Sequence, residues 1–120
     1  MPGPRGRRGW RGGRGVQRGQ VGRVLEPCLL TLLQEQDRHG YDLIAALGRF
    51  GLEPALLDSG LVYRMLRQME EAGWVASRWD TAGSGPARRV YSLTPAGQSA
   101  LAEWLDELGR THDMLHRLLG

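Results

Sequence analysis

The period of the hydrophobic pattern changes at Gly73, and this change limits the possible folds of the chain more than any other feature. Before it, residues 59–72 predict an amphipathic helix, because their apolar residues follow the spacing i, i+3, i+4, i+7. After it, residues 74–79 and 88–93 predict the two strands of a β-hairpin, and the Gly-rich residues 81–86 predict its loop. The apolar stripe of the helix consists of Val62, Met65, Leu66 and Met69.

Helical spacing predicts three further helices. Residues 27–36 begin with a proline, which suits a first helical turn, and residues 40–49 form a shorter helix. Thr94 and Pro95 suit the N-cap and first turn of a long helix that continues to about Leu119. This last helix carries a heptad seam with one polar interruption, formed by Leu101, Trp104, Leu108, Thr111, Leu115 and Leu118.

Three short helices, a hairpin and a long helix follow one another in the order of a winged helix-turn-helix. We therefore expect an α+β fold that is mostly α, with a long C-terminal helix that serves dimerisation. A second copy of the chain is a common way for a domain of this size to bury more apolar surface.

Charge is distributed unevenly along the chain. All 16 basic residues are Arg, and seven of them lie in residues 1–23, which contain no acidic residue. The other nine stand against 13 acidic residues, so residues 24–120 have a net charge of −4. Residues 1–23 are also rich in Gly, which predicts a disordered tail. Arg-Gly tracts can bind nucleic-acid phosphates, although an extension without a role is the simpler interpretation.

A mildly acidic domain needs a local basic face in order to bind DNA. A helix about 10–12 Å in diameter fits a major groove about 12 Å wide, so helix 59–72 could present its polar face there while the hairpin reaches the DNA backbone or the minor groove. Side chains alternate along a strand, so only one of two adjacent arginines points outward from a given face. The candidate DNA-binding residues are Ser59, Gly60, Tyr63, Arg64, Arg67, Arg88 and Arg89.

Several residues also have a purely structural interpretation. Asp58 or Ser59 can cap helix 59–72, and the Ser59 hydroxyl could also hold a phosphate. Tyr41, Trp74 and Trp79 are interpreted as packing residues, the two tryptophans at the base of the hairpin.

Five short motifs, taken in order, resemble the PadR family of transcriptional regulators. The resemblance covers residues 25–119 and implies a homodimeric repressor that binds a palindromic operator in double-stranded DNA. It also implies that the last helix contacts the partner subunit. The motifs are His39-Gly40-Tyr41-Asp42-Leu43, Ser59-Gly60-Leu61-Val62-Tyr63-Arg64, Gly73-Trp74-Val75, Gly85-Pro86-Ala87-Arg88-Arg89-Val90-Tyr91, and Leu93-Thr94-Pro95 with Gly97.

The chain is similar to the compact members of the family, which have no separate C-terminal domain. This similarity divides it into a disordered tail at residues 1–23, a winged helix-turn-helix DNA-binding domain at residues 24–95 and a dimerisation helix at residues 96–120. Some compact members bind flat aromatic ligands beside a Trp of the last helix. The candidates for an effector site or dimer interface are therefore Trp104, Leu101, Leu108 and Leu115.

Other classes of function are disfavoured by the sequence. The Gly-rich tract precedes no strand–turn–helix unit, and no Ser, His and acidic residue stand in a nucleophile motif, so neither an enzyme nor a cofactor is expected. His112 and His116 are spaced as metal ligands, but histidines near a helix C-terminus also favour the macrodipole, and no metal is predicted. The alternative that stays open is a winged helix that binds protein partners through its acidic body.

The single Cys28 provides no disulfide framework. No apolar run approaches the roughly 18 residues of a membrane span. From these two observations we expect a cytoplasmic protein that does not enter a membrane.

Overall fold

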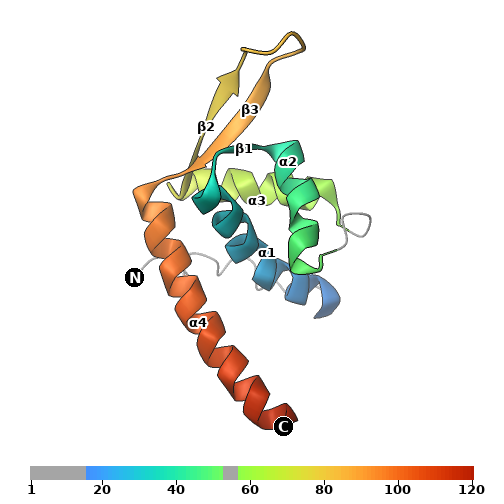
Figure 1. Cartoon of the computed structure of the whole chain (residues 1–120), viewed down its shortest axis with the longest axis vertical. Coiled ribbons are helices and arrows are strands. Elements are labelled where there is room, and N and C mark those ends of the chain that lie inside the picture. Colours follow the sequence, from blue (N-terminus) through green and yellow to red (C-terminus); the bar gives the residue numbers. More distant parts are fainter. Residues whose placement is uncertain (1–15, 53–56) are drawn as a thin grey trace.

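The computed structural model describes residues 16–52 and 57–120, with side chains from residue 24 onward. Helices α1, α2 and α3 pack together, the β2–β3 hairpin projects from one side of this group, and α4 runs away in the opposite direction (Figure 1). The elements are α1 (Val16–Glu35), β1 (Arg38–His39), α2 (Gly40–Ala46), the 3-10 helix η2 (Leu47–Phe50), α3 (Ser59–Glu71), β2 (Val75–Asp80), β3 (Arg88–Leu93) and α4 (Pro95–Leu119).

Helix α1 is the central element of the core. All the leucines of this helix whose side chains the structure describes are buried, and Cys28 is half-buried. Burial raises the pKa of the Cys28 thiol to about 11, so the thiol stays protonated at neutral pH. The buried leucines of α1 are Leu25, Leu29, Leu30, Leu32 and Leu33.

The predicted start of this helix at Pro27 is wrong, because α1 begins at Val16 and contains Pro27. A proline inside a helix loses one backbone hydrogen bond. The turn before it is nevertheless packed into the core, since Leu25 is fully buried and Glu26 is 3% exposed. Residues 1–15 of the expected tail lie outside the described residues, and the domain boundaries remain a prediction.

The three strands form an antiparallel sheet in the order β1-β3-β2. In the β2–β3 pair the register runs from Val75 opposite Leu93 to Asp80 opposite Arg88. The predicted hairpin is thus confirmed, and its base is packed into the core while residues 81–88 at its tip are exposed. Strand β1 was not predicted; with two residues it is defined only by its pairing to β3.

The end of α3, the start of the hairpin and the start of α4 meet at one junction. Gly73, with φ of 85°, ends α3 in the left-handed conformation. The Thr94 hydroxyl donates to the Gly73 carbonyl at 2.6 Å and accepts from the Gly97 backbone N–H at 3.0 Å. The Thr94 backbone N–H donates to the Trp74 carbonyl at 3.1 Å, and a Cβ at Gly97 would overlap that same carbonyl oxygen.

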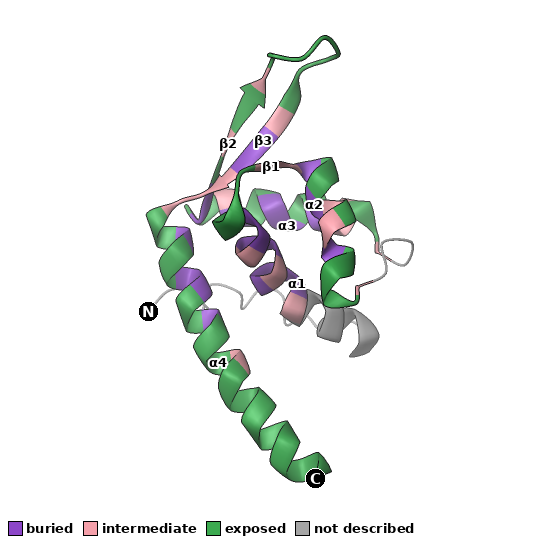
Figure 2. Ribbon diagram, viewed as in Figure 1, coloured by how far each residue is buried: buried purple, intermediate pink, exposed green. Residues whose placement is uncertain are grey.

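Helix α4 divides into a packed half and an uncovered half (Figure 2). In the first half, Leu101 and Trp104 are buried, and the Trp104 indole N–H donates to the Glu26 carboxylate of α1 at 2.7 Å. Beyond Leu108 the helix is exposed to its end. The order of elements confirms the predicted winged helix-turn-helix.

Within the described ranges, none of the helices combines the length and the apolar character that crossing a membrane requires.

Gly97→Ala should destabilise the fold by about 2 kcal/mol or more, because its methyl group would overlap backbone rather than a movable side chain. Gly109→Ala is the matched control in the same helix. A Cβ there meets nothing within 4 Å, so alanine should stabilise the chain by about 0.5–1 kcal/mol. Urea unfolding followed by circular dichroism measures the free energy of unfolding of each variant. Equal stabilities of the two variants would show that Gly97 does not limit the packing of the junction.

Candidate nucleic-acid interface

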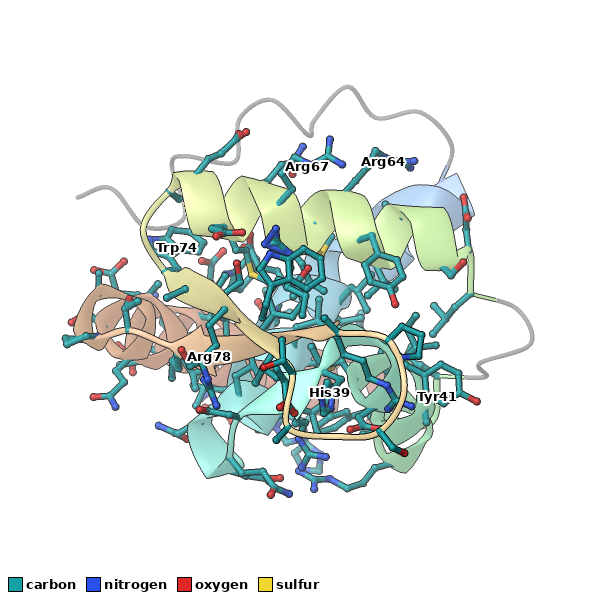
Figure 3. The ribbon with its side chains drawn as sticks, turned by 90° about the horizontal axis from the view of Figure 1, so that it is seen from above. His39, Tyr41, Arg64, Arg67, Trp74 and Arg78 are labelled. Carbon is teal, nitrogen blue, oxygen red and sulfur yellow. The ribbon has the colours of Figure 1, made fainter. Side chains whose placement is uncertain are left out.

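The outer face of α3 is basic and open to solvent. Tyr63, Arg64 and Arg67 are exposed, and Figure 3 shows the two arginines side by side along the edge of α3 that faces away from the other helices. The opposite face of α3 is fixed in the core by the predicted apolar stripe, whose members are at most 1% exposed. The packing of this stripe determines which side chains α3 turns outward.

The N-terminus of α3 is capped by Asp58. Its carboxylate accepts from the Gly60 backbone N–H at 2.9 Å, which satisfies one of the helix donors that lack an intrahelical partner. Of the two capping residues that the sequence left open, Asp58 is therefore the cap. Ser59 is exposed and Gly60 half-buried at this end of the helix.

Tyr63 lies against the start of α2. A Cβ at Gly40 would meet Cε1 of the Tyr63 ring at 2.6 Å, so a larger residue there would displace the ring. Tyr63 nevertheless keeps 41% of its surface exposed. The contact brings together the Gly of the first motif and the Tyr of the second motif.

The two arginines of the hairpin differ in their surroundings. Arg88 is exposed, whereas Arg89 is half-buried with its guanidinium 4.6 Å from the centre of the Trp79 ring. Arg89 also donates to the Ser77 hydroxyl at 3.0 Å. Strand alternation had indicated that the two would point to different faces, and the structure places them so.

His39 connects the helical body to the outer end of β2. Its two ring nitrogens lie 3.3 Å from carboxylate oxygens of Asp42 and Asp80. The pKa of Asp80 is lowered, first by the backbone N–H of Ala82 and then by His39. Asp80 therefore stays charged at neutral pH and holds the first turn of the hairpin loop through Ala82.

In α3 and the hairpin, three exposed arginines have no acidic partner among the described side chains. Among the side chains that the structure describes, no carboxylate lies within ion-pair distance of Arg64, Arg67 or Arg88. In contrast, Arg49 pairs with Glu35, and Arg78 pairs with Asp37 at 3.1 Å. Exposed guanidinium groups without partners can bind phosphates and the acceptor edge of guanine.

The four candidates on α4 for an effector site or dimer interface fall into two groups. Leu101 and Trp104 are buried inside their own chain, Leu108 is half-buried, and Leu115 is 46% exposed. The seam therefore does not present one continuous surface. Its first part packs against α1, and its second part is uncovered.

Two aromatic residues are more exposed than the sequence predicts. Tyr41 is 73% exposed, and Figure 3 shows it pointing into solvent near the start of α2. Trp79 is 60% exposed near the outer end of β2, whereas Trp74 is buried as predicted. Interpreting Tyr41 and Trp79 as packing residues is thus wrong, because hydrophobicity alone does not show which face of an element is covered.

The His112–His116 pair lies on the uncovered half of α4. The two rings are nearly parallel with centres 6.5 Å apart, and Nδ1 of His112 lies 3.6 Å from Asp113. In the part of the chain that the structure describes, no group of three potential metal ligands comes together.

The sequence model of the transcriptional regulator PadR-like family matches residues 29–103. The chain belongs to the PadR-like family. The matched segment runs from the buried leucines of α1 to the residue before Trp104, and it contains α3 and the whole hairpin.

Known transcriptional regulators support this assignment at the level of both sequence and fold. Transcriptional regulator Rv3488 of Mycobacterium tuberculosis is 37% identical over 66% of this chain and 63% of its own length. A PadR-like regulator from Bacillus cereus superimposes with a TM-score of 0.74 at 25% identity, covering 84% of this chain and 96% of that one.

Bacillus subtilis PadR has been crystallised in complex with operator DNA. It superimposes with a TM-score of 0.59 at 26% identity, over 68% of this chain and 46% of PadR. The chain thus spans about half the length of this relative. In sequence it covers 44–63% of the three curated bacterial regulators that it matches.

Asp58→Ala should destabilise the protein by about 1 kcal/mol, because it removes the acceptor for a backbone donor of α3. Ser59→Ala, one residue further on, should change the free energy of unfolding by less than about 0.5 kcal/mol, as expected for an exposed side chain. Thermal unfolding followed by calorimetry distinguishes the two. A larger loss of stability for Ser59→Ala than for Asp58→Ala would identify Ser59 as the cap.

Proposed function

We propose that this chain is a homodimeric repressor that binds a palindromic operator in double-stranded DNA and releases it when an effector binds. The observation that carries the proposal is the outer face of α3, where Arg64 and Arg67 are exposed without acidic partners among the described side chains. The family assignment adds weight, since a relative has been crystallised on its operator. Such a repressor would act in the cytoplasm, where bacterial DNA lies.

The proposed docking puts α3 in the major groove and the hairpin beside it. Tyr63, Arg64 and Arg67 would face base edges and phosphates, while the exposed Ser59 hydroxyl and the neighbouring Gly60 would approach the DNA backbone at the start of α3. Arg88 near the hairpin tip would reach the backbone of the flanking DNA. This geometry is supported by the projection of the hairpin beyond the helices in Figure 1.

Dimerisation through α4 is supported by its exposed apolar side chains. A surface of this kind at the end of a projecting helix is unfavourable in water and is typical of a protein interface. A second copy of the chain would cover it and would place two α3 helices for two half-sites. The exposed apolar residues are Leu105, Met114, Leu115, Leu118 and Leu119.

A small aromatic effector would act at the boundary between the two halves of α4. Trp104 is packed against Glu26 at this boundary, and the half-buried Leu108 lies one turn further on. A flat ligand inserted beside Trp104 would change the angle of α4 relative to α1. In a dimer held together by α4, such a change would alter the separation of the two α3 helices.

Arg64→Gln and Arg67→Gln should each weaken operator binding tenfold or more, because a good arginine contact to a base is worth about 1–3 kcal/mol per protomer. Arg117→Gln, in the last turn of α4, is the control and should leave the affinity unchanged. Fluorescence anisotropy at constant salt measures the affinity for a duplex that the unmodified protein selects from random DNA. The protein should be natively folded by circular dichroism in every case.

If Arg64→Gln and Arg67→Gln bind the duplex as tightly as the control Arg117→Gln does, α3 is excluded as the binding element. If the unmodified protein binds DNA no better than an acidic control protein does, the alternative of a protein-binding winged helix is favoured.

Leu115→Gln combined with Leu118→Gln should shift the protein from dimer to monomer. Each leucine buried in an interface contributes about 1.5–3 kcal/mol, and a two-fold dimer loses each contact twice. His116→Gln lies between them and should leave the dimer intact. Sedimentation velocity at micromolar concentration gives the mass, and a double variant that stays dimeric would place the interface elsewhere.

A further inference from the structure

The two adjacent arginines of β3 are held differently, which suggests that they have different roles. Arg88 lies opposite Asp80 in the strand register and is exposed. Arg89 lies opposite Trp79, stacks over its ring and donates to Ser77. A phosphate could be bound by Arg88 directly, whereas Arg89 would first have to leave two partners.

The contacts of Arg89 continue into α3. The Ser77 hydroxyl accepts from Arg89 at 3.0 Å and donates to the Glu70 carboxylate at 2.7 Å. Glu70 lies in the last turn of α3, Ser77 in β2 and Arg89 in β3. A serine hydroxyl can donate one hydrogen bond while it accepts another, so both contacts can form at once. We call these three residues and Trp79 the α3–wing relay.

The residues of the α3–wing relay lie next to a buried part of the core. Tyr91, opposite Ser77 in the register, is 7% exposed, and burial raises the pKa of its phenol. Among the described residues, the bond between Ser77 and Glu70 is the one hydrogen bond between a side chain of α3 and a side chain of the hairpin. The other side-chain bonds of the hairpin to the body involve Asp37 and His39, which lie outside α3.

We propose that Arg89 is a positioning residue that fixes the angle between the hairpin and α3 through the relay, and that Arg88 is the arginine of this pair that neutralises a DNA phosphate. The inference rests on the proposed binding of DNA. It goes further by assigning selectivity to a residue that does not touch the DNA. With the relay in place, α3 and the hairpin meet the duplex as one rigid unit, and only operators that suit both elements bind tightly.

Salt dependence separates the two roles, because the slope of log affinity against log salt counts the phosphates that the protein neutralises. The unmodified chain and its variants Arg88→Gln, Arg89→Gln and Ser77→Ala are titrated with the selected duplex and with a scrambled duplex between about 50 and 200 mM salt. Arg88→Gln should lower the slope by about one per protomer and weaken binding to both duplexes alike. Arg89→Gln and Ser77→Ala should leave the slope unchanged and lower the ratio of the two affinities about tenfold.

Two further variants test whether charge or geometry matters at this position. Arg89→Lys keeps the charge but loses the planar fork, so it should not restore the affinity ratio. The double variant Ser77→Ala with Arg89→Gln should be no worse than Arg89→Gln alone, since both changes break the same relay. A slope lowered by Arg89→Gln, or a ratio restored by Arg89→Lys, would overturn the proposal and make Arg89 a phosphate ligand.

A measurement without DNA keeps this proposal separate from the proposed function. The indole resonance of Trp79 in the NMR spectrum reports the guanidinium above its ring, so Ser77→Ala and Arg89→Gln should shift it while Arg88→Gln should not. An unmoved Trp79 resonance in Ser77→Ala would overturn the relay. If the unmodified protein binds no duplex, the proposed function fails, and the Trp79 resonance still decides whether the relay exists.

Discussion

The close approach of Gly97 to the carbonyl oxygen of Trp74 is the constraint on which the other elements depend. At this point α3 has just ended, β2 is about to begin, and α4 starts after the return of β3. The Trp74 carbonyl accepts from the Thr94 backbone N–H, and the Thr94 side chain holds both Gly73 and Gly97. Any side chain at Gly97 would push α4 off the backbone of the hairpin, so the junction fixes the directions of three elements together.

The basic surface follows from this junction and from the core. The buried stripe of α3 turns Arg64 and Arg67 outward, and the antiparallel register gives Arg88 and Arg89 opposite faces. On the other side of the junction, Trp104 and its bond to Glu26 fix the first half of α4 against α1. The second half of α4 keeps its apolar side chains in solvent. One small set of backbone contacts thus sets the angle between the proposed DNA-binding face of α3 and the proposed dimer surface of α4.

Local pattern predicted the parts of the structure that depend on local physics. Helix α3, the hairpin and α4 were predicted from the hydrophobic period and from Gly73, Thr94 and Pro95. Caps, turns and periodicity depend on residues that are neighbours in the sequence, so the sequence alone indicates them. The start of α1 was not predicted because a proline is typical of the first turn of a helix, which pointed to Pro27. The burial of Leu25, before this proline, depends on elements that are distant in the sequence. The surroundings of Arg89 could not be predicted either. They arise from a strand register and from Glu70, a residue that no local pattern connects to β3.

In the proposed function, a dimer of this chain presents two α3 helices to one face of the DNA. Selection of bound fragments from a pool of random duplexes, using the full chain at physiological salt, tests it most directly. We expect enrichment of an inverted repeat whose half-sites lie about one helical turn, roughly 34–36 Å, apart. An enriched motif without two-fold symmetry, or no enrichment over the starting pool, would contradict it.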